Sequence, residues 1–193
     1  MKILIGSNNQ GKVKEYKTLL GSSFNPLPLS ELGINLDVEE TGSTYEENAL
    51  IKLNFLKAEC NFPIITDDSG IEVEYLDGRP GIYSARYAGD NALDKDNIDK
   101  LLYELSGVKL RRAKFVCTIA YWDPRSNSEP IICSGECNGE ILEKRKGISG
   151  FGYDPIFYIP ILQRTFAELA KEEKNTLSHR YEAVKELLKR INI

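Results

Sequence analysis

Apolar and polar residues alternate along the chain in two periods, one typical of strands and the other typical of helices. The segments with strand-like patterns are 2–5, 26–36, 64–73, 113–122, 131–137 and 139–143, of which 26–36 combines a strand with a turn. The segments with apolar residues at helical spacing are 13–20, 44–60, 94–105 and 178–191. A polar turn is predicted at 124–130, within an antiparallel meander. Because strands and helices are interleaved, we expect an α/β protein whose sheet is neither all parallel nor all meander.

Hydroxyl and carboxyl side chains at fixed spacing mark the predicted beginnings of helices. Thr44 and Glu47 form a capping box, in which each side chain can bond a backbone amide of the first helical turn. Thr165 and Glu168 form a second capping box, and Ser178 is a predicted N-cap of the last helix. These short-range signals predict where three of the helices begin.

Length and composition restrict the classes of function. The 193 residues, 41% hydrophobic and 28% charged, suffice for one large domain or two small lobes, and we expect a single domain over 1–193. A net charge of -4 argues against a nucleic-acid partner, which requires a dense basic face. The apolar runs are too short for a membrane helix or a signal peptide, so we expect a cytoplasmic protein without a membrane partner. Four cysteines without a Cys-x-x-Cys pair, and one histidine, argue against zinc.

The segment 64–73 carries two adjacent carboxylates, Asp67 and Asp68, followed by Ser69 and Gly70. Apolar residues flank this cluster, so we expect it at a strand end or bend that faces a cleft. Two neighbouring acids repel each other unless they share a cation or a proton, which favours one half of a divalent-metal site. The alternative is an ordinary turn in which short side chains cap the backbone.

The segment 6–12 joins the first strand to the first helix and nearly matches the phosphate-binding pattern G-x-x-x-x-G-K. The next residue is Val13, where that motif needs Ser or Thr to bind magnesium, so a P-loop ATPase or GTPase is disfavoured. Free amides at a helix N-terminus, its positive dipole end and Lys12 would still suit a phosphate. The alternative is a plain strand-to-helix turn.

Charged residues gather at two further helix beginnings. Glu39 and Glu40 precede the helix at 44–60 and could supply another metal ligand, although such acids are usually solvated. His179 and Arg180 occupy the first turn of the last helix, where the dipole disfavours cations. Together with Lys174, they indicate an anionic or acceptor-rich ligand nearby.

A glycine-rich segment at 147–157 contains two aromatic rings, Phe151 and Tyr153. An aromatic face can stack on a nucleobase with about 1–3 kcal/mol, and Asp154 could accept a hydrogen bond from a base edge or a ribose. A glycine-rich loop with aromatic residues in the core is the alternative interpretation.

Together, these segments resemble the inosine triphosphate pyrophosphatase family, which hydrolyses non-canonical purine nucleoside triphosphates. The matching segments follow the family's order over nearly the whole chain: Ser7-x-Asn9-x-x-Lys12, Glu39–Gly42, Asp67–Gly70, Pro80–Tyr87, Gly150–Pro155, Glu173–Asn175 and Ser178–Arg180. Two departures are minor: Asn8 replaces a common glycine, and Tyr181 stands where glycine is frequent. Neither departure removes a catalytic group.

The resemblance implies an activity, a cofactor and an architecture. The expected reaction converts ITP, dITP or XTP and water to the monophosphate and pyrophosphate, which removes these nucleotides from the pool. The resemblance also implies dependence on Mg2+ and a homodimer. The fold that it implies is an elongated mixed sheet with flanking helices, in two lobes around a central cleft.

The resemblance further implies roles for individual residues. Glu39 and Asp68 would hold Mg2+, and Asp68 would also accept the proton of the attacking water, whose pKa the cation lowers. Asp67 would be a second ligand or would orient the first. The residues expected to bind the triphosphate are Ser7, Asn8, Asn9, Gln10, Gly11, Lys12 and Ser69. The residues expected around the base are Phe151, Gly152, Tyr153, Asp154, Lys174, His179 and Arg180.

Recognition of the base would depend on its 6-keto oxygen, which accepts hydrogen bonds. The donors Lys174 and Arg180 suit this oxygen and would be left unpaired by the 6-amino group of adenine. Two other classes of function stay open at this point: a P-loop phosphotransferase and a nucleotide sensor without turnover. The products distinguish the three, because only the preferred hydrolase releases pyrophosphate.

Overall fold

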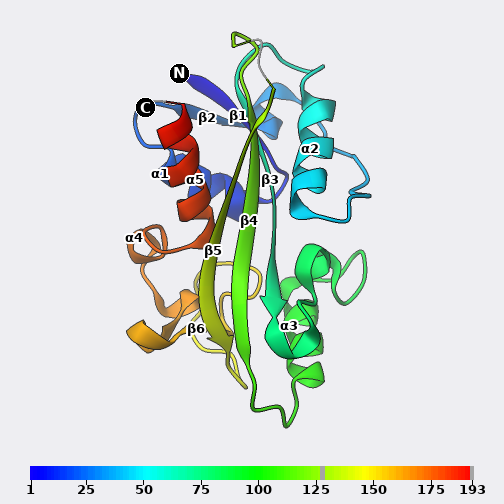
Figure 1. Cartoon of the computed structure of the whole chain (residues 1–193), viewed down its shortest axis with the longest axis vertical. Helices are drawn as coiled ribbons and strands as arrows, with labels where there is room; N and C mark the ends of the chain where they lie inside the picture. The colour runs from blue at the N-terminus through cyan, green and yellow to red at the C-terminus, as the bar shows by residue number, and fades with distance from the viewer. Residues whose placement is uncertain (127–128, 192–193) are drawn as a thin grey trace. The chain divides into compact units, whose positions relative to one another are not determined.

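The computed structural model describes residues 1–126 and 129–191 (Figure 1). Its strands are β1 (Lys2–Gly6), β2 (Asn25–Pro28), β3 (Ile64–Val73), β4 (Arg112–Trp122), β5 (Ile131–Ile141), β6 (Phe157–Ile159) and β7 (Arg164–Thr165). Its α-helices are α1 (Gln10–Leu19), α2 (Tyr45–Leu56), α3 (Asp94–Glu104), α4 (Lys171–Lys174) and α5 (His179–Arg190). Short 3-10 helices are η1 (Leu29–Leu32), η2 (Glu74–Leu76), η3 (Gly81–Arg86), η4 (Pro160–Leu162) and η5 (Phe166–Glu168). Residues 127–128 of the turn predicted at 124–130 lie outside the described residues.

The strands in the described residues form one seven-stranded sheet in the order β2-β1-β3-β4-β5-β6-β7. Strand β1 is parallel to β2 and β3, whereas β6 is antiparallel to β5 and β7. The sheet is therefore mixed, as predicted, and the α/β class is confirmed. In the register of β1 with β3, Gly6 lies opposite Thr66. The loop that leaves β1 thus begins beside the point where Asp67 and Asp68 follow on β3.

Two predictions about the strands were wrong, and a third is now given its bounds. The acidic cluster lies inside the continuous strand β3, not at a strand end. Within 26–36, the predicted strand ends at Pro28, and the predicted turn is η1 followed by Gly33 with φ of 66°. One strand, β5, replaces the two predicted at 131–137 and 139–143. The strand continues through Gly139. A Cβ there would lie 2.6 Å from the Tyr158 carbonyl oxygen, so glycine allows β6 to pair closely with β5.

The capping signals are largely confirmed. Thr44 Oγ1 accepts a hydrogen bond from Glu47 N at 3.1 Å, but the Glu47 carboxylate accepts from Ser43 N at 2.6 Å instead of returning to Thr44. Both hydrogen bonds of the box formed by Thr165 and Glu168 are present at η5. Helix α5 begins at the residue after Ser178. The local sequence thus determines where these helices begin.

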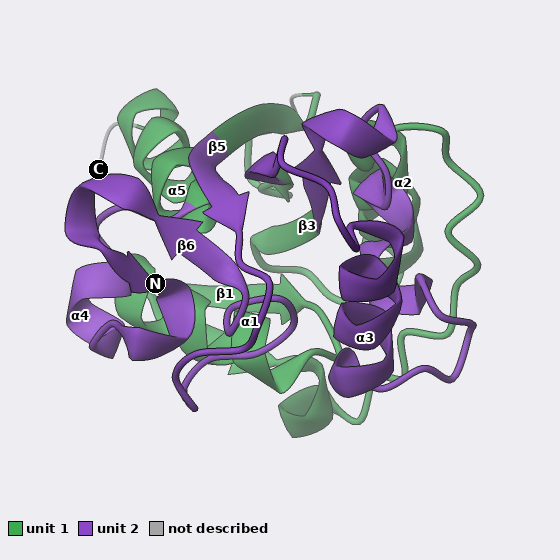
Figure 2. Cartoon of the chain, turned by 90° about the horizontal axis from the view of Figure 1, so that it is seen from below, with its two compact units in different colours: residues 1–68, 117–135, 179–193 green, residues 69–116, 136–178 purple. Residues whose placement is uncertain are grey.

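The chain divides into two compact units, coloured separately in Figure 2. Unit 1 comprises the described residues of 1–68, 117–135 and 179–193, and unit 2 comprises residues 69–116 and 136–178. Strands β3, β4 and β5 each contribute residues to both units, so β5 changes colour along its length in Figure 2.

Each unit has its own apolar core. In unit 1, alternate residues of β1 face opposite sides: Ile3 and Ile5 join α1 and α5 in one cluster, whereas Leu4 joins α2 in another. In unit 2, Phe115, Phe157 and Phe166 form an aromatic cluster with ring centroids 4.6–5.8 Å apart. Ile64 and Ile65 at one end of β3 pack in the clusters of unit 1, and Ile71 and Val73 at the other end pack in the core of unit 2. This close packing fixes both ends of the strand.

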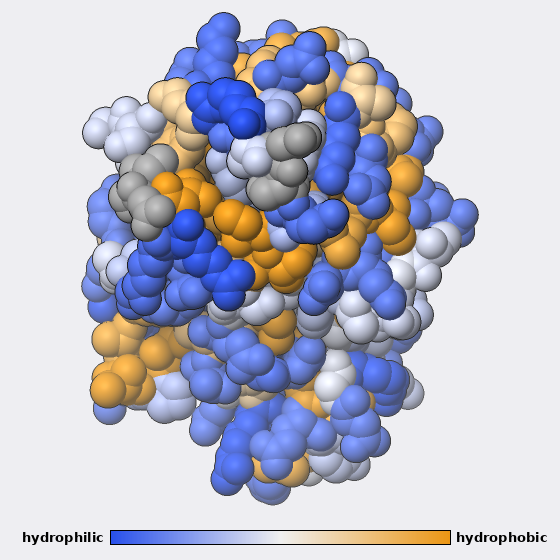
Figure 3. Space-filling view, turned by 45° about the horizontal axis from the view of Figure 1, so that its top comes forward, coloured by the Kyte–Doolittle hydropathy of each residue, from blue (hydrophilic) through white to orange (hydrophobic). Residues whose placement is uncertain are grey.

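The face of the molecule seen in Figure 3 carries mostly polar side chains. Figure 3 shows hydrophilic residues over most of the visible face, with apolar residues between them, as is typical of a surface that faces water. Within residues 1–126 and 129–191, no helix combines the length and the apolar character needed to cross a membrane.

Candidate active site

The loop after β1 folds back on itself through Asn9. Its Oδ1 accepts hydrogen bonds from Gly11 N at 2.8 Å and Lys12 N at 3.2 Å, and Asn9 N donates to Ser7 Oγ at 3.1 Å. Asn9 is thus the N-cap of α1, a position that asparagine favours because its short side chain reaches the first free amides. The expectation of free amides was therefore wrong for Gly11 and Lys12. The contribution of this loop to a phosphate site depends on the Lys12 side chain.

Asp67 lies among cations. Its Oδ2 is 3.1 Å from Lys12 Nζ and accepts a hydrogen bond from Arg180 Nη2, also at 3.1 Å. The Cys117 thiol donates to the same oxygen at 3.6 Å. Burial raises the pKa of Asp67, but Lys12 and Arg180 outweigh this effect and hold the pKa well below its usual value. Asp67 is therefore an anion whose charge is compensated, and its Oδ1 is buried without a hydrogen-bond partner in the described residues.

Arg180 connects Asp67 to an acid on α1 that sequence reasoning missed. Its Nη1 donates to the Glu15 carboxylate, and its guanidinium lies 5.7 Å from the centre of the Tyr16 ring. Arg180 is 1% exposed and Glu15 is 6% exposed, so two buried carboxylates surround one buried cation. The signal in the sequence was an acid at position 15, directly before an apolar residue of the buried helix face.

Asp68 has different surroundings from its neighbour. Asn48 Nδ2 donates to Asp68 Oδ2 at 3.1 Å, and Lys52 Nζ is 4.0 Å from Oδ1. Burial raises the pKa of the Asp68 carboxyl, and the opposing effects of Lys52 and Lys12 do not cancel this. A carboxylate with a raised pKa is a better proton acceptor than an ordinary aspartate. The two adjacent acids thus differ in the direction of their pKa shifts because their partners differ.

Helix α2 supplies the residues around Asp68. Asn48 and Lys52 are one turn apart, and both are buried. Lys52 Nζ bonds Glu40 Oε1 at 2.9 Å, so it is Glu40 that the structure brings towards Asp68, whereas Glu39 is exposed. The sequence showed only that Asn48 and Lys52 share a polar face. Two polar residues one turn apart, next to the apolar face of the helix, were the available signal.

The acidic cluster fits a magnesium ion that is held jointly with a substrate. The oxygen donors of Asp67 and Asp68 suit a hard cation, and the unpartnered Asp67 Oδ1 marks an unused acceptor. Among the described residues, no three His, Cys, Asp or Glu side chains form a group that could hold a metal. Mg2+ usually binds one or two carboxylates together with several waters and substrate phosphates.

The predicted base-binding residues of unit 2 form a second cluster. Asp154 Oδ2 accepts hydrogen bonds from Lys174 Nζ at 2.5 Å and from Phe151 N at 3.0 Å. Lys174 Nζ also lies 4.9 Å from the centre of the Phe151 ring. Gly150 adopts φ of 82°, and a Cβ there would lie 2.0 Å from Asp154 Oδ2. Glycine therefore allows the loop to close tightly on the carboxylate.

Tyr153 has a different position from the one expected. It is 4% exposed, and its hydroxyl donates to the Ser84 carbonyl at 2.8 Å. Its ring thus belongs to the core of unit 2, as the alternative interpretation of the glycine-rich loop held, whereas Phe151 is half-buried. Gly152 N donates to Asp94 Oδ2 at 2.6 Å.

The predicted site residues therefore divide between the two units. The triphosphate loop, Asp67, Asp68, His179 and Arg180 belong to unit 1, whereas Ser69, the loop at 151–154 and Lys174 belong to unit 2. His179 is buried at the beginning of α5. Lys174 and Arg180 were both expected at the base, but the structure pairs Lys174 with Asp154 and Arg180 with Glu15 and Asp67.

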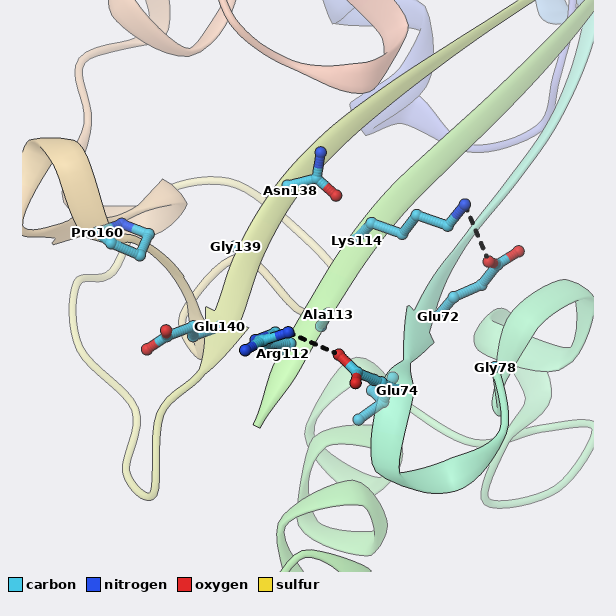
Figure 4. A pocket seen from close by; sticks show the side chains of 11 residues that line it. Glu72, Glu74, Gly78, Arg112, Ala113, Lys114, Asn138, Gly139, Glu140 and Pro160 are labelled. Atoms are coloured by element: carbon cyan, nitrogen blue, oxygen red, sulfur yellow. Dashed lines mark ion pairs between the residues drawn. The ribbon is translucent and has the colours of Figure 1, made fainter. Parts of the chain in front are cut away.

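A separate cavity of about 610 Å³ in unit 2 contains none of these residues. Its lining residues come from β3, β4 and β5, from η2 and the turn after it, and from η4, and two ion pairs join some of them (Figure 4). Lys114 Nζ lies 3.5 Å from Glu72 Oε2, and Arg112 Nη1 lies 3.7 Å from Glu74 Oε2. These partly exposed ion pairs are typical of a solvated sheet face.

Comparison with known proteins identifies relatives over almost the whole chain. The model of the Ham1 family matches residues 3–190. A protein of Staphylococcus aureus (strain MRSA252), named dITP/XTP pyrophosphatase, is 49% identical over 183 residues, which cover 95% of this chain and 92% of the relative.

Solved structures agree with this comparison. The structure of the Staphylococcus aureus Ham1 protein has a TM-score of 0.87 and 46% identity, and covers 100% of this chain and 98% of its own. The nucleoside-triphosphatase / dITP/XTP pyrophosphatase of Mycobacterium abscessus has a TM-score of 0.74 and 38% identity, with coverage of 97% and 99%. The resemblance stated from the motifs is thus confirmed.

Proposed function

Because the chain belongs to the Ham1 family, we propose that it hydrolyses dITP and XTP, and also ITP, to the monophosphate and pyrophosphate. The relatives named dITP/XTP pyrophosphatase support this activity. The structural observation that carries the proposal is the pair of buried acids on β3. One acid is compensated by cations, and the other has a raised pKa. Removal of these nucleotides from the pool would be the consequence.

Asp68 is the proposed proton acceptor. Its raised pKa brings the carboxylate closer to the working pH, where a general base is most effective. Glu39 and Asp68 would hold Mg2+, and the chemistry that this ion supplies when bound is a lowered pKa of water and neutralisation of phosphate charge. Asp67 would hold Lys12 in place and keep the local charge balanced.

The basic side chains of unit 1 suit the triphosphate. Lys12 and Lys52 are each paired with a carboxylate at about hydrogen-bond distance, and both are largely buried. A phosphate group can form an ion pair with such a lysine, because its negative charge replaces that of the carboxylate. The other proposed contacts of the triphosphate are Ser7, Asn8, Asn9, Gln10, Gly11 and Ser69.

The base would be bound by the cluster around Phe151. The ring of Phe151 offers a stacking face, and Asp154 fixes the ammonium of Lys174 beside it. Lys174 would donate to the 6-keto oxygen, which adenine lacks. The other residues of the proposed set are Gly152, Tyr153, His179 and Arg180. Tyr153 would support the loop from the core through its hydrogen bond to the Ser84 carbonyl, and Arg180 would hold Asp67 through its hydrogen bond to Oδ2.

Four further expectations stay predictions. One family model covers residues of both units, which supports a single catalytic domain. The homodimer and the arrangement of two lobes around a central cleft follow from the resemblance alone, and the cytoplasmic location was expected from the short apolar runs of the sequence. The oligomeric state can be measured by light scattering on the eluting protein.

A panel of nucleotides tests the proposed activity. The panel includes dITP, ITP, XTP, dGTP and ATP, with and without Mg2+, and the products are separated by chromatography. We expect pyrophosphate from the first three in the presence of Mg2+. Orthophosphate would indicate a phosphotransferase or a phosphatase. Tight binding without products would indicate a nucleotide sensor.

A further inference from the structure

One buried carboxamide touches both acidic segments of unit 1. The side chain of Asn48 belongs to a residue that is 0% exposed. Its Oδ1 accepts from Gly42 N at 2.9 Å, and its Nδ2 donates to Asp68 Oδ2 at 3.1 Å. The orientation of the carboxamide follows from chemistry, because a backbone N–H can only donate and an ionised carboxylate can only accept. The oxygen must face Gly42, and the amino group must face Asp68.

Two neighbouring features hold this arrangement in place. Thr66 Oγ1 donates to the Ala49 carbonyl at 2.7 Å, which ties α2 to β3 next to Asn48. A Cβ on Gly42 would lie 2.7 Å from Asn48 Oδ1, so only glycine lets the loop backbone approach this closely. The loop that carries Glu39 and Glu40 is thus anchored on the same side chain that orients Asp68.

The charge of the donor distinguishes the two acids of β3. Asp67 faces Lys12 and Arg180, which compensate its charge. Asp68 instead accepts from a neutral amide, and the nearer partner of Lys52 is Glu40 at 2.9 Å. Lys52 Nζ also lies 4.0 Å from Asp68 Oδ1, so the shorter of these two contacts of Asp68 is the hydrogen bond from Asn48. A hydrogen bond of this kind fixes the orientation of a metal-binding carboxylate.

We propose that Asn48 is a positioning residue for the metal-binding carboxylates. By holding Asp68 Oδ2 and the Gly42 backbone in one fixed relation, it lets Asp68 and Glu39 bind one divalent cation together. The inference rests on the proposed function, to which it adds a residue that acts through Asp68. Loss of a hydrogen bond to a metal ligand typically weakens metal affinity about 10- to 100-fold.

The test measures Mn2+ binding to the nucleotide-free protein by electron paramagnetic resonance. The variant is Asn48→Leu, which keeps the size of the side chain and removes both hydrogen bonds. We expect the dissociation constant of Mn2+ to rise about 10-fold or more. In steady-state assays, the Mg2+ concentration for half-maximal rate should rise by a similar factor, with a smaller change in kcat at saturating Mg2+.

The chain offers a matched control in Asn97. This asparagine of unit 2 is 2% exposed and also bridges two segments: its Oδ1 accepts from Ala88 N at 2.7 Å, and its Nδ2 donates to the Ala85 carbonyl at 3.1 Å. Asn97→Leu should lower stability by a comparable amount and leave the Mn2+ dissociation constant unchanged. If Asn48→Leu does not fold, as judged by circular dichroism, Asn48→Ala takes its place.

Each outcome decides the inference. Weaker Mn2+ binding in the Asn48 variant alone supports it. Unchanged Mn2+ binding in a folded Asn48 variant overturns it, as does equal weakening in the Asn97 variant or a parent protein without saturable Mn2+ binding. Failure of the proposed function would look different, because the parent protein would then release no pyrophosphate from dITP.

Discussion

At the scale of single residues, chemically identical side chains acquire different properties from their partners. Asp67 and Asp68 are adjacent and both buried, yet the pKa of the first is lowered by Lys12 and Arg180, whereas burial raises the pKa of the second. A motif of two aspartates therefore does not by itself say which carboxylate accepts a proton. The partners that decide this are Arg180 and Asn48, which are far from the motif in the sequence.

Replacement of Asp68 by asparagine tests its assigned role. Asp68→Asn keeps the shape of the side chain and removes the charge and the proton acceptor, so we expect turnover of dITP to fall about 100-fold or more. Nucleotide binding, measured by calorimetry, should persist. Asp123→Asn is the control, because Asp123 pairs with Arg125 in unit 1 and has no assigned role in catalysis. Near-parental turnover of Asp68→Asn would contradict the assignment.

Replacement of Lys174 tests the recognition of the base. Lys174→Ala removes the proposed donor to the 6-keto oxygen, so the ratio of kcat/KM for ITP to that for ATP should fall about 10-fold. Lys100→Ala is the control: Lys100 Nζ lies 4.3 Å from the centre of the Tyr87 ring, a contact similar to that of Lys174 with Phe151. An unchanged ratio for Lys174→Ala would place the base contact elsewhere.

At the scale of secondary-structure elements, close approaches of the backbone decide where glycine is required. On β3, a Cβ at Gly70 would lie 2.1 Å from the Gly81 carbonyl oxygen and 2.6 Å from Ser84 Oγ. That hydroxyl donates to the Gly81 carbonyl and accepts from Ile71 N. The glycine after the acidic cluster thus lets η3 pack directly on the strand.

Gly70→Ala is accordingly expected to destabilise the protein strongly. The added methyl group meets backbone atoms that cannot turn away, so the free energy of unfolding in urea should fall by about 3 kcal/mol. Gly107→Ala is the control: Gly107 has φ of 73° and a Cβ there would meet open space, so only the left-handed conformation costs energy, about 1 kcal/mol. Equal effects of the two substitutions would argue against the close packing of η3 on β3.

At the scale of the whole molecule, three strands connect the two compact units. Strands β3, β4 and β5 each have residues in unit 1 and in unit 2, so the hydrogen bonds of one strand support both cores. Loss of either core should therefore destabilise strands that the other core needs. This connection favours cooperative unfolding of the chain.

We expect one unfolding transition for the whole chain. The single tryptophan, Trp122, belongs to unit 1, so its fluorescence reports on that unit, whereas far-ultraviolet circular dichroism reports on both. The two signals should change at the same urea concentration. Leu53→Ala in unit 1 and Phe157→Ala in unit 2 should each lower the free energy of unfolding by about 2–5 kcal/mol. Each should therefore shift the shared midpoint to a lower urea concentration. Two separate transitions would show that the units unfold independently.

The sequence by itself determined the features that depend on neighbouring residues. The capping boxes gave the beginnings of α2 and η5, and the spacing of apolar residues gave α1, α3 and α5. The motifs gave the family and the acids of β3. These predictions succeeded because a cap or a helix face is formed by residues only three or four positions apart.

Only the tertiary structure decided the partners of the candidate catalytic residues. The hydrogen bonds of Asp68 with Asn48, of Asp67 with Arg180 and of Glu15 with Arg180 join residues 20, 113 and 165 positions apart. Such pairs depend on strand register and on which helix covers which face of the sheet, and no local pattern encodes either. The physical reason is that burial and opposite charge, which set the pKa of each acid, exist only once the distant segments have packed together.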